Sequence, residues 1–258
     1  MFLRKDRRYA GGILPPLQLV CILISCAFLF SCSRISVHTV QFYAMDVLVN
    51  SSIISTSDSL GRELNDGIRT IITEIEEQIY SGEEMREIDI FGEIGLGAIS
   101  KGYALDNIAG YLERESILNA YISFESAMLA LGNDRRGNLW QIAIPDPVEP
   151  ERTAGVIEAS DKFIAFASGI RDGGDLLSVV IITDAPTAAM AGELRERFKN
   201  NGAVTEALAH ALLATDRQRA VDFYMSGAFD FEMILFYVSD DDPRGFEILH
   251  TNVSFSGR

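Results

Sequence analysis

The clearest pattern along the chain is a helical repeat of apolar residues between residues 60 and 79. Its members recur three and four positions apart and are Leu60, Leu64, Ile68, Ile71, Ile72, Ile75 and Ile79. This spacing places the apolar side chains on one face of an α-helix, and acidic residues fill the opposite face. Asp58 is predicted as the N-cap. The pattern therefore predicts an amphipathic helix of about five turns.

Short segments rich in β-branched and aromatic residues predict strands. The expected strands are residues 37–49, 88–91, 120–124, 127–131, 139–145, 162–167, 176–183, 233–238 and 246–250. Further helices are expected at residues 102–115, 186–199, 204–214 and 216–225. Because strands and helices do not alternate regularly, we expect an α+β fold with mixed, largely antiparallel sheets and packed helices.

The N-terminus has a different pattern, in which basic residues precede an apolar run. Four basic residues lie between positions 4 and 8, and residues 13–30 are mostly apolar. Such a run closed by a small residue, here Ser31, is typical of a secretion signal. Ser31 before Cys32 also resembles the lipobox of bacterial lipoproteins. Residues 1–31 are therefore predicted to be a lipoprotein signal peptide, with Cys32 as the lipidated first residue of the mature chain.

An uncleaved membrane anchor is the alternative, because the apolar run is barely as long as the roughly 20 residues that span a bilayer. Either interpretation exports residues 32–258, so we expect a membrane-anchored domain that faces the periplasm. Cys21 and Cys26 lie in the apolar run and would leave with it. With Cys32 lipidated, the mature chain keeps no cysteine for a disulfide, a thiolate metal site or a nucleophile.

The charge of the chain limits its ligands. The sequence has 22 basic and 37 acidic residues, a net charge of −15. Removal of residues 1–31 leaves 18 basic and 36 acidic residues, a net charge of −18. Such a domain should repel nucleic acid, so no nucleic-acid partner is expected. A phosphate-bearing ligand would need a cation or a helix N-terminus to offset the charge.

A glycine-rich segment leads into the helix expected at residues 102–115. It contains Gly95-Leu96-Gly97-Ala98-Ile99-Ser100-Lys101-Gly102-Tyr103-Ala104-Leu105-Asp106. Glycines let a backbone approach a ligand closely, while the lysine and the N–H groups of a helix start can bind phosphate. On its own, the segment fits a phosphate-binding turn and a plain tight turn equally well.

The same segment resembles the DLGxIAKGYAVD signature of the ApbE-type flavin transferases, which are FAD:protein FMN transferases. Other matching segments lie in the family's order at residues 44–47, 123–126, 130–132, 140–147, 167–169, 175–180 and 206–212. The resemblance spans about residues 40–240 and implies an ApbE-like, T-fold-related domain for residues 32–258.

The resemblance also implies a reaction. In this family, FMN is moved from FAD to a threonine or serine hydroxyl of a target protein, and AMP is released. A divalent cation, usually Mg²⁺, neutralises the pyrophosphate. The chain is therefore expected to be an exported transferase with FAD as substrate, Mg²⁺ or another divalent cation as cofactor, and an exported acceptor protein as partner.

Positions in the family's motifs imply the site. Met45 would contact the flavin nucleotide, and four residues would line the cofactor cleft: Lys101, Gly102, Ala104 and Asp106. The implied cation ligands are the Ser100 carbonyl oxygen and the side chains of Glu206 and His210. The last two lie four apart on a predicted helix and share a face. The alternative for His210 is a half-buried histidine that binds no metal, since an imidazole nitrogen suits Mg²⁺ less well than an oxygen.

Two departures from the family's pattern leave other functions open. The family has an H-x-I-x-D-P-x-T-G loop where this chain has only the five residues 170–174, so no catalytic residue is assigned. Glu125 and Ser126 replace the two glycines of the family's NLGG segment. One alternative is an inactive exported lipoprotein on the same scaffold that binds a nucleotide, a metal or a partner protein, and another is an FAD pyrophosphatase. A third is an exported structural or interaction protein whose matches to the family are coincidental.

Overall fold

The computed structural model describes residues 35–81, 99–169, 176–185, 201–213, 217–226, 231–250, 253 and 255–257. Within them, an eight-stranded sheet has the order β1-β2-β3-β4-β7-β8-β9-β10, and all its neighbouring strands are antiparallel. Its strands are β1 (Ser36–Ala44), β2 (Val47–Ser55), β3 (Ala120–Phe124), β4 (Ala127–Leu131), β7 (Lys162–Ser168), β8 (Leu176–Asp184), β9 (Glu232–Val238) and β10 (Phe246–His250). A three-stranded sheet contains β11 (Phe255–Gly257), β6 (Thr153–Ala159) and β5 (Trp140–Pro145), in that order.

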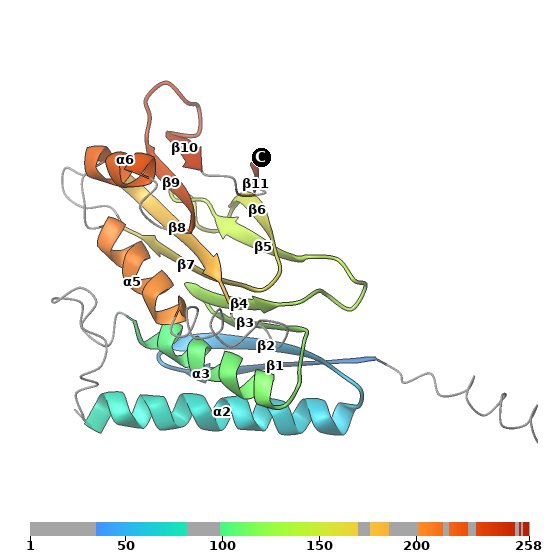
Figure 1. The fold of residues 1–258 in the computed structure, drawn as a ribbon. Helices are drawn as coiled ribbons and strands as arrows, with labels where there is room; N and C mark the ends of the chain where they lie inside the picture. The colour runs from blue at the N-terminus through green and yellow to red at the C-terminus, as the bar shows by residue number, and fades with distance from the viewer. Residues whose placement is uncertain are drawn as a thin grey trace, which may run out of the picture. The chain divides into compact units, whose positions relative to one another are not determined.

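The described helices pack on one face of the large sheet, and the small sheet packs on the other (Figure 1). The helices are α2 (Asp58–Ser81), α3 (Ser100–Arg114), α5 (Asn201–Leu213) and α6 (Arg217–Ser226). Strand β7 shows how one strand serves both faces. Phe163 and Ala165 contact the helical side, while Ile164 between them packs among residues of the small sheet. This alternation follows from the two-residue period of a strand.

The long amphipathic helix is confirmed as α2. Leu64, Ile68 and Ile72 of the predicted stripe are at most 1% exposed. The predicted N-cap is one residue off, because the Oγ of Ser57 accepts the N–H of Leu60 at 3.2 Å while Asp58 is already helical. A side-chain oxygen that accepts an N–H of the first turn is the function of an N-cap.

The single strand expected at residues 37–49 is wrong, because the chain reverses within it. Strands β1 and β2 form a hairpin in which Ala44 pairs with Val47. The two residues between them, Met45 and Asp46, have φ values of 50° and 59°. Two consecutive left-handed residues are typical of a tight hairpin turn, which usually contains glycine or asparagine. Without that signal, the apolar alternation predicted one continuous strand.

Several predictions lie outside the described residues. They are the signal peptide at 1–31, Cys32, the strand at 88–91, the glycines before Ala98, the loop at 170–174 and the helix at 186–199. Across the described part of the chain, no helix is both long and apolar enough to cross a bilayer.

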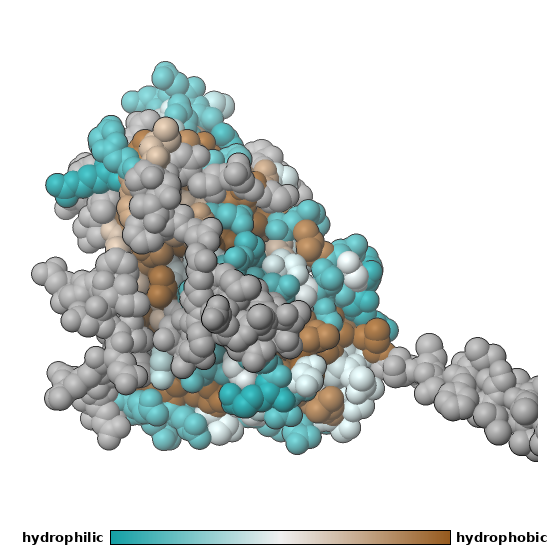
Figure 2. Space-filling view, in the orientation of Figure 1, coloured by the Kyte–Doolittle hydropathy of each residue, from teal (hydrophilic) through white to brown (hydrophobic). Residues whose placement is uncertain are grey.

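Strand β1 lies at one edge of the large sheet, and neither β1 nor its neighbour β2 has a charged side chain. Neither Ser36–Ala44 nor Val47–Ser55 contains a lysine, arginine, aspartate or glutamate. Ile35 and Leu118, which are 54% and 60% exposed, add apolar surface. Figure 2 shows hydrophobic surface close to the start of the described chain, beside a largely hydrophilic face. The many acidic residues of the chain are therefore carried by other elements.

Candidate functional site

The candidate site lies where the first turns of α3 and α5 meet. Gly102 and Gly202 approach so closely that a Cβ on Gly102 would lie 2.2 Å from the carbonyl oxygen of Gly202. A Cβ on Gly202 would lie 2.5 Å from the carbonyl oxygen of Gly102. Both distances are far below van der Waals contact, so only glycine fits at either position. The two helix starts therefore pack backbone against backbone.

Glu206 of α5 reaches the N-terminus of α3. Its Oε2 accepts the N–H of Gly102 at 2.7 Å, and the residue is only 3% exposed. The residue at the N-cap of α3 is Ile99, which supplies no capping side chain. Glu206 thus satisfies an N–H group that the sequence around α3 leaves without a side-chain partner. Burial raises the pKa of Glu206 to about 7, against the opposing effect of the N–H groups of Gly102 and Lys101 and the charge of Lys101.

Asp106 of α3 makes the converse contact with α5. Its Oδ1 accepts the N–H of Gly202 at 2.8 Å, and its Oδ2 accepts the N–H of Ala203 at 2.9 Å. The first turn of α5 contains no acidic residue of its own. Burial raises the pKa of Asp106 to about 7, although the two N–H groups oppose that shift.

Lys101 and His210 lie beside these carboxylates. The Nζ of Lys101 donates to the Oγ of Ser126 at 3.3 Å. The pKa of His210 is below its usual value, first because the ring is partly buried and then because Lys101 is positively charged. The structure therefore brings together most of the residues implied by the family motif. These are Ser100, Lys101, Gly102, Asp106, Glu206 and His210.

The other two predicted residues have buried side chains. Met45 is 9% exposed and Ala104 has no exposed area, and both belong to the core between α2, α3 and the sheet. The N–H of Met45 donates to the Oε1 of Glu76 at 3.0 Å. A role for either residue in binding the flavin nucleotide stays a prediction.

The turn between β3 and β4 carries the two residues that replace the glycines of NLGG. Glu125 has a φ of 61°, a left-handed conformation that favours glycine. Ser126, which follows it, contacts Lys101 as described and accepts the N–H of Phe166 on its carbonyl oxygen at 2.8 Å. The replacement therefore puts a strained acidic residue next to the partner of Lys101.

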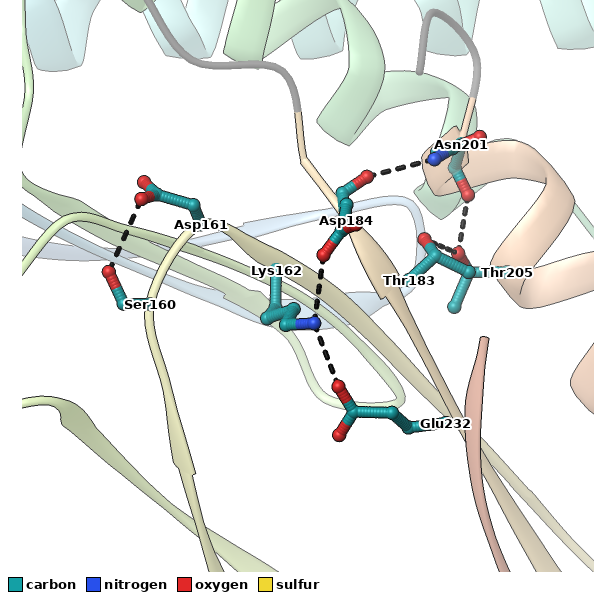
Figure 3. Close-up of polar contacts among 8 residues, drawn as sticks. All are labelled: Ser160, Asp161, Lys162, Thr183, Asp184, Asn201, Thr205 and Glu232. Atoms are coloured by element: carbon teal, nitrogen blue, oxygen red, sulfur yellow. Dashed lines mark hydrogen bonds and ion pairs between the residues drawn. The ribbon is translucent and has the colours of Figure 1, made fainter. Parts of the chain in front are cut away.

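A polar network that the sequence did not predict ties the start of α5 to the sheet (Figure 3). The Nδ2 of Asn201 donates to the carbonyl oxygen of Asp184 at 2.8 Å, and the hydroxyls of Thr183 and Thr205 are 2.7 Å apart. Together these contacts fasten the first turn of α5 to strand β8. No sequence signal marks them, because each residue is of an ordinary type and its partner lies on a different element.

Lys162 extends this network across three strands (Figure 3). Its Nζ lies 2.8 Å from the Oδ1 of Asp184 and 2.8 Å from the Oε1 of Glu232. Partial burial opposes the ammonium charge, but these two carboxylates outweigh it and leave the pKa of Lys162 above its usual value.

The donors at the α3–α5 junction suit a divalent cation that takes part of its coordination from a substrate. Within the described ranges, no group of three or more histidine, cysteine, aspartate or glutamate side chains could hold a metal ion. Glu206 is nevertheless a deeply buried carboxylate whose anionic form is disfavoured by burial, and a cation would stabilise that form. Mg²⁺ commonly binds one or two carboxylates together with substrate phosphates and water.

Comparisons with known proteins agree with this geometry. The model of the ApbE family matches residues 65–172. An FAD:protein FMN transferase of Vibrio cholerae serotype O1 is 31% identical over 111 residues, which are 43% of this chain. The aligned stretch spans only 33% of that relative's length.

Solved structures share the fold at low sequence identity. The flavin transferase ApbE from Vibrio cholerae has a TM-score of 0.63 and 15% identity, covering 85% of this chain and 98% of that one. The apo form of the Pseudomonas stutzeri flavinyl transferase ApbE has a TM-score of 0.60 and 11% identity, covering 86% and 97%. These matches confirm the predicted α+β class with antiparallel sheets and the ApbE-like fold.

Proposed function

We propose that this chain is an FAD:protein FMN transferase, because the model of the ApbE family matches residues 65–172 and solved ApbE structures share its fold. It would transfer FMN from FAD to a threonine or serine hydroxyl of an exported acceptor protein and release AMP. The oxygen of that hydroxyl bonds to the phosphorus on the FMN side of the pyrophosphate. The bond from this phosphorus to the bridging oxygen breaks, this oxygen leaves with AMP, and the proton of the hydroxyl passes to solvent.

The observation that carries the proposal is the hydrogen bond between Glu206 and the N–H of Gly102, at 2.7 Å. It joins residues 104 positions apart and places Glu206 at the helix start that contains Lys101. An ammonium and a helix N-terminus favour an anion, whereas a buried carboxylate favours a cation. The pyrophosphate of FAD together with a divalent cation satisfies both preferences.

The residues that would hold the cation are Ser100 through its carbonyl oxygen, Glu206 through its carboxylate and His210 through its ring. A bound cation would neutralise the pyrophosphate and stabilise the charge of the leaving AMP. Lys101 is suited to contact a phosphate oxygen, because its ammonium belongs to the first turn of α3 and its described hydrogen bond is to the neutral hydroxyl of Ser126. Gly102 allows close approach of the backbone.

We also propose that the protein is exported and anchored through a lipid on Cys32, with residues 1–31 removed. Support comes from the sequence pattern of residues 4–32. Mass spectrometry of the protein purified from the membrane fraction should find Cys32 as the N-terminal residue with a lipid attached. A chain that keeps residues 1–31 and carries no lipid would favour an uncleaved anchor instead.

The transferase activity can be tested with the full chain purified in mild detergent. The protein is incubated with FAD, with Mg²⁺ or Mn²⁺, and with a threonine-bearing acceptor, and AMP, FMN and acceptor-bound flavin are then separated by chromatography. Glu206→Ala and Lys101→Met should each lower AMP release by about 10- to 100-fold. Asn107→Ala is the matched control, because Asn107 is exposed on the same helix and bonds only locally to the carbonyl oxygen of Tyr103.

The products decide between the functions. Acceptor-bound flavin with AMP supports the transferase. Free FMN with AMP in equal amounts, with or without acceptor, would assign the FAD pyrophosphatase activity instead. Binding of FAD without any AMP would assign a non-catalytic nucleotide-binding lipoprotein, and neither binding nor AMP release would contradict a flavin-related function altogether.

A further inference from the structure

Helices α3 and α5 carry the same short pattern at their starts. In each helix, a glycine of the first turn is followed four residues later by an acidic residue, Gly102 with Asp106 and Gly202 with Glu206. The acid of each helix accepts N–H groups at the start of the other. Asp106 binds Gly202 and Ala203, and Glu206 binds Gly102.

We propose that these residues form a reciprocal clasp in which each helix caps the other, and that Asp106 is a positioning residue that holds Glu206 in place. The clasp follows from the contacts alone, whereas its effect on FAD chemistry rests on the proposed function. In this role Asp106 binds the backbone of α5, whereas the family motif implies that it lines the cofactor cleft.

Each helix start takes its carboxylate from the other helix, because the described first turns of α3 and α5 contain no acidic residue. The N-cap position of α3 is Ile99, and the first turn of α3 contains no acidic residue. At the start of α5, the side chain of Asn201 is used to bind Asp184, and its first turn also contains no acidic residue. The first N–H groups of a helix have no partner within the helix, so a carboxylate there satisfies them and complements the helix dipole.

The glycines keep the clasp closed. A Cβ on Gly102 or on Gly202 would lie only 2.2 or 2.5 Å, respectively, from the carbonyl oxygen of the opposite glycine. Any larger residue would separate the two helix starts and lengthen the hydrogen bonds between them. Because Glu206 is only 3% exposed, water cannot easily replace its bond.

The clasp fixes the distance between the two sides of the candidate site. Both carboxylate oxygens of Asp106 bind the backbone of α5 just before Glu206. Asp106 therefore fixes the start of α5, the helix that carries Glu206. Glu206 likewise fixes the start of α3, which carries Lys101. In this arrangement Asp106 acts on the substrate only through its neighbours.

Amide hydrogen exchange of the full chain in detergent tests the clasp without any substrate. In Asp106→Ala, exchange should accelerate by about tenfold or more at Gly202 and Ala203. It should also accelerate at Gly102, whose partner is Glu206 and not Asp106. Asp106→Asn should give a smaller change, because its amide oxygen can still accept one N–H group. Asn107→Ala should leave all three amides unchanged.

Two exchange results would overturn the clasp. One is acceleration at Gly202 and Ala203 with Gly102 unaffected, which would mean two independent caps. The other is unchanged exchange at all three amides in Asp106→Ala. Should Asp106→Ala fail to fold, Asp106→Asn and Glu206→Gln keep the side-chain shape and are judged by the same three amides.

Steady-state kinetics test the positioning role. Asp106→Ala should lower kcat for AMP release more than it raises KM for FAD, and Asp106→Asn should restore part of kcat. A higher KM with unchanged kcat would mean that Asp106 contacts FAD directly and would overturn the positioning role. If the unmodified chain neither binds FAD nor releases AMP, the proposed function fails, and the exchange data alone decide on the clasp.

Discussion

The two polar regions around the start of α5 hold their acidic residues in opposite ways. Toward α3, Asp106 and Glu206 are bound by backbone N–H groups, and burial raises the pKa of each to about 7. Toward the sheet, Asp184 and Glu232 share the ammonium of Lys162, with side chains that are 42% and 33% exposed. The first region depends on backbone geometry, the second on opposite charge in a partly solvated place. Substitutions that move the backbone should therefore destabilise the contacts between α3 and α5 most. Added salt should weaken only the ion pairs of Lys162.

The largest expected effect comes from adding one methyl group at the clasp. Gly102→Ala should lower the free energy of unfolding by about 3 kcal/mol, because the new Cβ would overlap the backbone of Gly202. Urea denaturation measures this change. Gly110→Ala is the matched control in the same helix, since its Cβ would meet only the side chain of Arg114 at 3.6 Å.

The control substitution should change the free energy of unfolding in the opposite direction. A glycine inside a helix costs about 0.5–1 kcal/mol relative to alanine, so Gly110→Ala should stabilise the protein by up to that amount. Equal losses in both alanine variants would mean that α3 tolerates no change anywhere and that the approach of the two glycines is not special.

The next effect is a dependence on pH that follows from the burial of Asp106. The pKa of Asp106 is raised from 3.8 to about 7 in the folded chain, so the folded state binds its proton more tightly than the unfolded state does. Between about pH 4 and pH 7 the folded state therefore carries more protons, and the free energy of unfolding should fall as the pH rises. Asp106→Asn cannot titrate and should show a shallower fall across this window in urea denaturation. A fall as steep as that of the unmodified chain would show that Asp106 is already ionised at low pH.

Two substitutions of Glu125 distinguish the effect of its charge from the effect of its left-handed backbone conformation. Glu125 has a φ of 61°, so Glu125→Gly should raise the free energy of unfolding by about 1 kcal/mol. The same variant removes a negative charge next to Ser126 and should lower KM for FAD. Glu125→Gln removes only the charge, so it should lower KM without the gain in stability. A stability gain in Glu125→Gln as large as in Glu125→Gly would contradict the strain argument.

The smallest effect is expected in the ion-pair network at the sheet. Lys162→Met should lower the free energy of unfolding by about 1 kcal/mol or less, because its partners are partly exposed. The difference from the unmodified chain should shrink in 1 M salt, where the screening length is only about 3 Å. The effect of Gly102→Ala should not change with salt, and if it does, the contrast between the two regions is wrong.

Local sequence patterns predicted most of the described helices and strands. They could not predict which residues far apart in the sequence contact each other. Strands β4 and β10 have the predicted bounds, because their apolar runs end at clear turn residues. Strand β6 was missed, because Gly155 interrupts its pattern to make room for the ring of Phe255. At the site, the family motif selected the residues of the α3–α5 junction. It could not predict that Asp106 binds a backbone 96 positions away, since that contact exists only in the folded chain.

The matched glycine–acid pattern of α3 and α5 has an evolutionary consequence. A larger residue at Gly102 harms the bond of Glu206, and a shorter side chain at Glu206 leaves the amide of Gly102 without its partner. Selection should therefore act together on Gly102, Asp106, Gly202 and Glu206, although the two pairs lie far apart along the chain. Among homologous chains, the length of the acidic side chain in one helix should covary with the residue at the start of the other.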